Sequence, residues 1–231
     1  DESMVAAVSA VEAEHGAVGA LVNNAGYSQG GPVEEVPLGV ARRQFETNVF
    51  GLARMCQLVM PAMREQRSGR IVNLSSMGGR MTFPGGGWYH ATKHAVEALS
   101  DALRFEVRPF GIDVVVIEPG VVVTAFGDTA VASAGDASDL AGPYDLMMAS
   151  VVTKTAGAYV KATRGAGITP EVVARRIEQA VSGRHPRPRR IVGAQARQIL
   201  GLRAVLPDRA WDRFLATQFE PPRPESRPSA S

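Results

Sequence analysis

The sequence is poor in cysteine, in charge of one sign and in long apolar runs, and each shortage excludes a class of protein. Its single cysteine, Cys56, cannot form an internal disulfide framework and suits a reducing compartment. Its 25 Lys and Arg residues nearly balance 23 Asp and Glu residues, which leaves a net charge of +2 and no basic field for nucleic acid. No apolar run approaches the ~18 residues of a membrane span. No signal-peptide pattern opens the chain. We therefore expect a cytoplasmic protein with no nucleic-acid partner and no membrane span.

Three short apolar runs predict buried parallel strands, because they are β-branched and apolar on both faces. They cover residues 20–22, 71–74 and 114–117. Each run ends in small or polar residues, which are Asn23 and Asn24, Ser75 and Ser76, and Glu118 and Pro119. Ligands of open α/β sheets bind outside the carboxyl ends of the strands. The three polar clusters therefore predict a binding site at one edge of the sheet.

Helical patterns separate these runs. An apolar stripe with alternating spacings of four and three runs from Phe45 to Met63, and Pro61 within it predicts a kink or an early end. A second helix is predicted over residues 89–107. The resulting β-α-β-α-β order predicts an α/β fold in a single domain with a doubly wound parallel sheet of the Rossmann type.

The pattern weakens after the third run. Residues 127–143 are rich in Gly, Ala, Asp and Ser, and an apolar helical pattern follows over 144–164. The last residues are rich in Pro, Ser and Arg, which is typical of disorder. The predicted parts are a domain over 1–195, a lid within it over 125–169, a helical extension over 196–219 and a disordered tail over 220–231.

Tyr89 and Lys93 form the strongest local motif. They lie four residues apart at the start of a predicted helix and so share a face. A tyrosine hydroxyl titrates near ~10, and a nearby ammonium lowers that pKa by favouring the phenolate. The pair can thus act as a general acid/base unit. Taken alone, it also fits a half-buried tyrosine beside a solvated lysine.

The surrounding residues narrow this choice. Asn48 lies in the helix before the second predicted strand, and Ser76 follows that strand. The first strand ends in the run Asn23-Asn24-Ala25-Gly26, and the third ends in the run Pro119-Gly120-Val121-Val122-Val123-Thr124. In this order the set resembles the short-chain dehydrogenase/reductase family, NAD(P)-dependent oxidoreductases with a Rossmann fold, over roughly residues 1–195. Residues 197–219 are similar to the hydroxysteroid-dehydrogenase-like branch, whose substrates are bulky and apolar.

The resemblance implies a catalytic set. Tyr89 would be the acid/base that protonates a carbonyl oxygen, and Lys93 would lower its pKa and hold the nicotinamide ribose. Ser76 would hydrogen-bond the substrate oxygen, so that Ser76 and Tyr89 both contact the substrate. Asn48 would position a water in a proton relay to Lys93. The implied reaction interconverts a secondary alcohol and a ketone or aldehyde.

The resemblance also implies the binding partners. The cofactor would be NAD or NADP, held by Tyr89 and Lys93 and by four further residues, Asn24, Gly26, Val122 and Thr124. The substrate would be a small alcohol or carbonyl compound, and the assembly a homodimer or homotetramer. His90 and His94 have metal-ligand spacing, but without an interior Glu we expect no metal site. Met77 and Met81, with Met147 and Met148, fit either a core or an adaptable apolar pocket.

One family feature has no counterpart. The family opens with a strand and a T-G-x-x-x-G-x-G turn that holds the pyrophosphate, and neither Gly30-Gly31 nor Gly85-Gly86-Gly87 supplies it. The sequence begins at Asp1 inside a helical pattern. We expect the chain to be a fragment that lacks the family's first βαβαβ portion. Its own first strand would then be an unpaired apolar edge, and we expect the fragment alone not to be a competent oxidoreductase. The alternative is a non-catalytic Rossmann-like scaffold that has lost dinucleotide binding.

Overall fold

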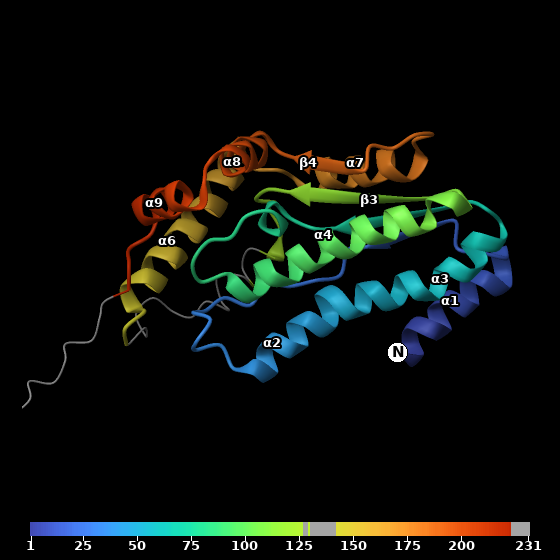
Figure 1. Cartoon of the computed structure of the whole chain (residues 1–231), viewed down its shortest axis with the longest axis horizontal. Coiled ribbons are helices and arrows are strands. Elements are labelled where there is room, and N and C mark those ends of the chain that lie inside the picture. Colours follow the sequence, from blue (N-terminus) through green and yellow to red (C-terminus); the bar gives the residue numbers. More distant parts are fainter. Residues whose placement is uncertain (127–128, 130–141, 223–231) are drawn as a thin grey trace, which may run out of the picture.

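A parallel sheet forms the centre of the protein in the computed structural model, which describes residues 1–126, 129 and 142–222 (Figure 1). The strands lie in the order β1 (Ala20–Asn23), β2 (Gly69–Leu74), β3 (Ile112–Pro119) and β4 (Arg189–Val192). Each strand runs parallel to its neighbour. This confirms the predicted parallel α/β sheet in one domain, and β4 adds a strand beyond the three apolar runs.

Helices connect and cover the strands (Figure 1). The α-helices are α1 (Glu2–His15), α2 (Leu38–Phe45), α3 (Leu52–Glu65), α4 (Gly87–Val107), α6 (Asp145–Lys161), α7 (Pro170–Ser182), α8 (Ala194–Val205) and α9 (Asp208–Gln218). Short turns of other helix types are η1 (Glu46–Gly51) and η4 (Ala162–Ala166), both π-helical, and η2 (Met77–Gly79) and η3 (Arg108–Phe110), both 3-10. The helix predicted over 89–107 is therefore confirmed, with its start at Gly87.

The prediction that the helix could end early at Pro61 is wrong. Pro61 lies inside α3, which continues to Glu65. Val59 and Met63, on either side of it, are fully buried, so packing outweighs the one backbone hydrogen bond that proline removes. The irregularity lies earlier, in the π-helical turn η1 between α2 and α3.

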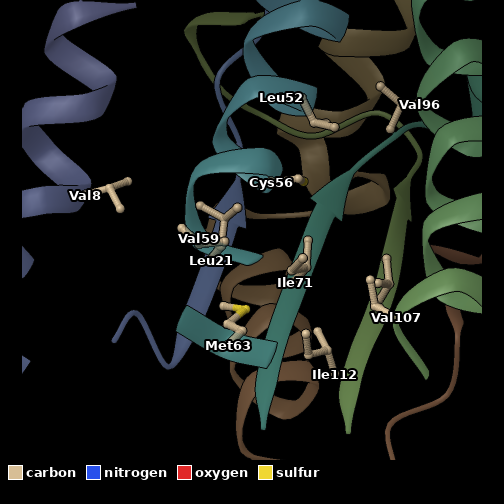
Figure 2. Packing of buried hydrophobic residues seen from close by; sticks show 11 residues of the cluster. Val8, Leu21, Leu52, Cys56, Val59, Met63, Ile71, Val96, Val107 and Ile112 are labelled. Carbon is tan, nitrogen blue, oxygen red and sulfur yellow. The ribbon is translucent and has the colours of Figure 1, made fainter. Parts of the chain in front are cut away.

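Apolar side chains cover both faces of the sheet. On one face α1, α3 and α4 pack through a cluster that includes Val59, Ile71 and Val96 (Figure 2). On the other face α7 packs through Ala180 and its neighbours against Val115 and the rest of its cluster. Because both faces are covered, the strands are apolar on both sides, as their sequences predicted.

The helices after β4 lie toward the carboxyl ends of the strands (Figure 1). In α8 and α9, Leu200 and Trp211 are buried in a third cluster, which also holds Met81 from the segment after β2. The predicted extension is thus packed on the sheet domain. Of the predicted lid, residues 127–128 and 130–141 lie outside the described residues, as do residues 223–231 of the predicted tail.

At the other side of the sheet, β1 is an edge strand. Within the described ranges its one hydrogen-bonded neighbour is β2, and Val22 is 39% exposed. The predicted unpaired apolar edge is therefore present in this part of the chain.

Within the residues that the structure describes, no helix is long and apolar enough to cross a bilayer.

Candidate active site

The carboxyl ends of β1, β2 and β3 open into a cavity of about 1290 Å³. Of the residues predicted from the sequence, seven line it: Asn24, Gly26, Ser76, Tyr89, Lys93, Val122 and Thr124. They come from segments far apart in the sequence, and the parallel sheet brings them together because its strands all end at one edge. Asn48 is the one predicted site residue that does not line the cavity.

Ser76 is oriented by the first turn after β2. It is the N-cap of η2, in an extended conformation, and its Oγ accepts a hydrogen bond of 3.1 Å from the Gly78 N–H. A serine hydroxyl that accepts one bond still has its own proton to donate. The Ser76 side chain lowers the pKa of the Tyr89 phenol, and both residues line the same cavity. The two predicted substrate-contacting hydroxyls therefore belong to one site.

Tyr89 lies in the first turn of α4. Burial raises the pKa of its phenol to about 12, the Ser76 hydrogen bond acts in the opposite direction, and Tyr159 raises the pKa further. The sequence predicted a lowered pKa through Lys93, and the direction is the reverse. The reason is that desolvation of the phenolate is the largest influence on this pKa and outweighs the lowering by Ser76. At neutral pH the phenol therefore holds its proton.

Lys93 is a buried cation on the wall of the cavity. It is 6% exposed, its Nζ donates a 2.7 Å hydrogen bond to the Leu74 carbonyl oxygen, and it lies 5.9 Å from the centre of the Tyr89 ring. Burial lowers the pKa of Lys93 to about 8, and Glu97 acts in the opposite direction. An ammonium has three N–H donors, so two remain for a ligand in the cavity.

Asn48 lies beneath the cavity and not on its wall. It sits in the π-helical turn η1 and is 1% exposed. Its Oδ1 accepts a 3.1 Å hydrogen bond from the Tyr27 N–H, and its Nδ2 donates a 2.9 Å hydrogen bond to the Tyr27 carbonyl oxygen. Its Nδ2 also donates to Thr92 Oγ1 at 3.1 Å. The side-chain amide thus fixes the turn after β1, so a proton relay would not use the amide atoms. π-helical turns of this kind are frequent at functional sites.

Gly26 is packed against these two groups. A Cβ at this position would lie 3.0 Å from Asn48 Oδ1 and 3.7 Å from Lys93 Nζ. Glycine is needed here so that the backbone can pass between the amide and the cavity.

The segment with Val122 and Thr124 is held by Ile168. The Val123 N–H donates to the Ile168 carbonyl oxygen at 3.0 Å, and the Ile168 N–H donates to the Val121 carbonyl oxygen at 3.2 Å.

Most of the apolar wall of the cavity was not identified from the sequence, apart from Met77 and Met81, for which an apolar pocket was one of the two predicted alternatives. It is formed by Met77 and Met81 after β2 and by side chains of α6, α8 and α9, among them Val151, Leu202 and Phe214. Met147 and Met148 are buried but do not line the cavity. No local signal marks these residues, because they meet only through contacts between the middle and the end of the chain.

Known proteins resemble this chain along most of its length. The family model for short chain dehydrogenase matches residues 1–134. An uncharacterized oxidoreductase of Bacillus subtilis is 32% identical over 216 residues, which are 93% of this chain and 75% of that protein. An NADPH-dependent 3-dehydrocapnine reductase of Ornithobacterium rhinotracheale is 33% identical over 214 residues, covering 89% of this chain and 73% of that protein.

A solved structure shares the fold. A short chain dehydrogenase/reductase from Burkholderia phymatum, in complex with NAD, has a TM-score of 0.70 and 25% identity over 96% of this chain and 75% of that one. A non-catalytic scaffold is not favoured, since the relatives named above are oxidoreductases. With its parallel sheet, its cavity at the strand ends and these matches, the chain belongs to the short-chain dehydrogenase/reductase family of oxidoreductases.

Proposed function

We propose that the protein is an NAD(P)-dependent oxidoreductase that interconverts a secondary alcohol and a ketone or aldehyde, with Tyr89 as its general acid/base. The observation that carries this proposal is one arrangement of three side chains. Ser76, Tyr89 and Lys93 line one cavity, and the Ser76 side chain lowers the pKa of the Tyr89 phenol. A carbonyl oxygen beside the two hydroxyls would receive a proton from one and a hydrogen bond from the other.

The residues of the cavity fit NAD or NADP. Lys93 has two N–H donors to offer to ribose hydroxyls. Gly26 has no side chain, so the backbone can lie close to Asn48, where a Cβ would be too near, and a ribose can approach that backbone. Val122 and Thr124 would hold the carboxamide, and Asn24 would contact the other ribose. The cavity of about 1290 Å³ also has room for a substrate beside a nicotinamide. A similar protein is NADPH-dependent by name, and a similar structure contains NAD.

The chemistry divides between the cofactor and the chain. A bound reduced nicotinamide supplies the hydride that the carbonyl carbon accepts. Tyr89 Oη gives its proton to the carbonyl oxygen, and the Ser76 hydroxyl stabilises the negative charge that develops there. Lys93 stabilises the phenolate that remains on Tyr89. Because the pKa of Tyr89 is raised to about 12, the phenol is already protonated at neutral pH, which favours reduction of the carbonyl.

We propose an apolar substrate. The cavity that holds Tyr89 is also lined by Met77, Phe83 and apolar residues of α6, α8 and α9. We also propose that the segment 125–169 sets the choice of substrate. Within it, Val151, Val152 and Ala158 of α6 line the cavity.

Two properties outside the site also remain proposals. The single buried free cysteine, Cys56, supports a cytoplasmic location. Exposed aromatic residues on the α3 and α4 side, Phe50 at 56% and Phe105 at 82%, support a homodimer or homotetramer.

The test of the function is a turnover measurement with a matched pair of variants. The protein is purified in a version that also carries the family's Gly-rich N-terminal portion, and it is assayed with NADH and with NADPH against ketones of increasing apolar size. Tyr89→Phe should lower kcat by at least ~100-fold, the low end for general acid–base catalysis, with the dinucleotide Kd near normal. Tyr144→Phe, which removes a hydroxyl that contacts Glu34 at the surface, should retain full turnover. Turnover that survives in Tyr89→Phe would refute the role of the phenol.

A further inference from the structure

His90 follows Tyr89 on α4 and is the polar side chain whose surroundings the proposed chemistry does not explain. It is 1% exposed, and its Nδ1 lies 3.0 Å from the carbonyl oxygen of Gly78. A carbonyl oxygen can only accept, so Nδ1 must carry the proton. In the neutral ring Nε2 is then an acceptor, and it has no hydrogen-bond partner within the described part of the chain. Burial holds the pKa of His90 at about 4, so the ring is neutral at physiological pH.

The ring fills the space between the two ends of the segment 77–86, which joins Ser76 to α4. A Cβ at Gly78 would lie 2.5 Å from His90 Nδ1, and a Cβ at Gly86 would lie 2.7 Å from Nε2. The Phe83 ring meets the imidazole edge to face, with centroids 4.4 Å apart. The His90 N–H also donates to Gly86 O at 2.9 Å. Both glycines are required, because any side chain at either position would displace the imidazole.

Gly78 links this ring to the site. Its N–H donates to Ser76 Oγ at 3.1 Å, and its carbonyl accepts the His90 Nδ1–H. Glycine has the greatest backbone freedom of any residue, so Gly78 needs an outside partner to keep its N–H on the hydroxyl. Ser76 in turn lines the cavity together with Tyr89, whose pKa it lowers. Hydrogen bonds therefore connect His90 through Gly78 to Ser76, which acts on the phenol.

We propose that His90 is a positioning residue, whose Nδ1–H fixes Gly78 and thereby holds the Ser76 hydroxyl against Tyr89. This proposal rests on the proposed function in so far as Ser76 and Tyr89 carry the chemistry. A neutral planar donor meets the requirement, because a charged side chain buried here without a partner would be costly. A shift of about an ångström in a positioned group is enough to slow an enzyme ~100-fold.

The first experiment uses the unaltered protein and needs no turnover. Nitrogen-15 NMR of labelled histidine reads which ring nitrogen carries the proton. His90 should show a protonated Nδ1 and an unprotonated Nε2 at pH 7. A proton on Nε2 alone would overturn the proposal, because Nδ1 could then not donate to Gly78.

The second experiment compares three variants. His90→Asn keeps a donor at the position of Nδ1 but loses the ring, whereas His90→Leu keeps apolar bulk and loses the donor. His90→Leu should lower kcat by ~10- to 100-fold with the KM for NAD(P)H within about two-fold of wild type, and His90→Asn should recover most of that loss. His185→Leu, at an exposed histidine outside α4, is the control with normal kcat. If His90→Leu equals or exceeds His90→Asn in kcat, packing alone explains the residue and the proposal fails.

Amide exchange separates this proposal from the proposed function. The Gly78 N–H should exchange faster in His90→Leu than in wild type and His90→Asn, because its carbonyl is released. If wild type reduces no ketone with either cofactor, the proposed function fails, and the exchange rates still decide the role of His90. Equal Gly78 exchange in all three proteins would overturn that role, whatever the turnover.

Discussion

At the scale of the residue, burial moves the pKa of three neighbouring groups on α4 toward their uncharged forms. It raises the pKa of Tyr89 to about 12 and lowers those of Lys93 to about 8 and His90 to about 4. In each case the uncharged form is favoured, because the cavity wall offers little water to solvate a charge. The phenol stays protonated and the imidazole stays neutral across the physiological range.

The lowered pKa of His90 predicts a pH-dependent stability. The unfolded chain binds a proton with an ordinary pKa of 6.5 and the folded protein with a pKa of about 4, so the folded state loses stability as the pH falls from 6.5 toward 4. The other titratable group acting on His90 is His94, which lowers its pKa further. Urea unfolding should show about 2 kcal/mol lost between pH 7 and pH 5 from this group.

The variant His90→Asn provides the control for that measurement, since it removes the titrating ring. Between pH 7 and pH 5 its free energy of unfolding should fall by about 2 kcal/mol less than that of wild type. Identical pH profiles for the two proteins would mean that His90 is not the group responsible.

At the scale of the element, side-chain amides at the carboxyl ends of β1 and β2 tie these strands and α4 together. Asn23 and Asn73 are paired in the register of β1 and β2, and Asn23 Nδ2 donates to Asn73 Oδ1 at 2.9 Å. Asn73 Nδ2 donates to Ser100 Oγ at 2.9 Å, and Ser100 Oγ donates to Val96 O at 2.6 Å. Because Asn73 is fully buried, a slip of one residue would leave its amide without partners.

Asn73→Leu should therefore destabilise the sheet. The substitution leaves the Asn23 and Ser100 groups short of a buried partner and should cost ~1–3 kcal/mol of unfolding free energy. Chemical denaturation measures it, with Asn24→Ala as the control, because Asn24 is exposed and should change stability by no more than ~0.5 kcal/mol. A loss in Asn73→Leu as small as in the control would show that the amide ladder does not hold the register.

Local patterns predicted the elements well and the site in part. The apolar runs and their polar ends located three strands, and the four-residue spacing located Tyr89 and Lys93 on one helix face. No local pattern marks the π-helical turn around Asn48, since α and π turns have the same composition. The raised pKa of Tyr89 and the packing around His90 depend on burial by distant segments. Spacing along the chain does not contain that information.

At the scale of the whole molecule, the cavity joins a polar half to an apolar half. The strand ends supply the hydroxyls and the ammonium, and the last helices supply the wall. Phe219, directly after α9, stacks on Phe83 with centroids 6.0 Å apart and lies 5.9 Å from Lys154 Nζ. The next residue, Glu220, donates its N–H to Ser150 Oγ at 3.1 Å. The end of the described chain thus connects α6 with the segment that follows Ser76.

This junction predicts that Phe219 limits substrate size. In Phe219→Ala the wall loses a ring that stacks on Phe83, so the cavity should lengthen toward α6 while the groups around Tyr89 stay in place. The ratio of kcat/KM for a bulky apolar ketone to that for a small one should rise ~10-fold, since pocket contacts of this kind discriminate by ~1–3 kcal/mol. Phe105→Ala, on the exposed face of α4, should leave the ratio unchanged. A ratio that stays constant in Phe219→Ala would place the size limit elsewhere on the wall, and a loss of kcat for all ketones alike would show that Phe219 acts on the catalytic groups and not on substrate size.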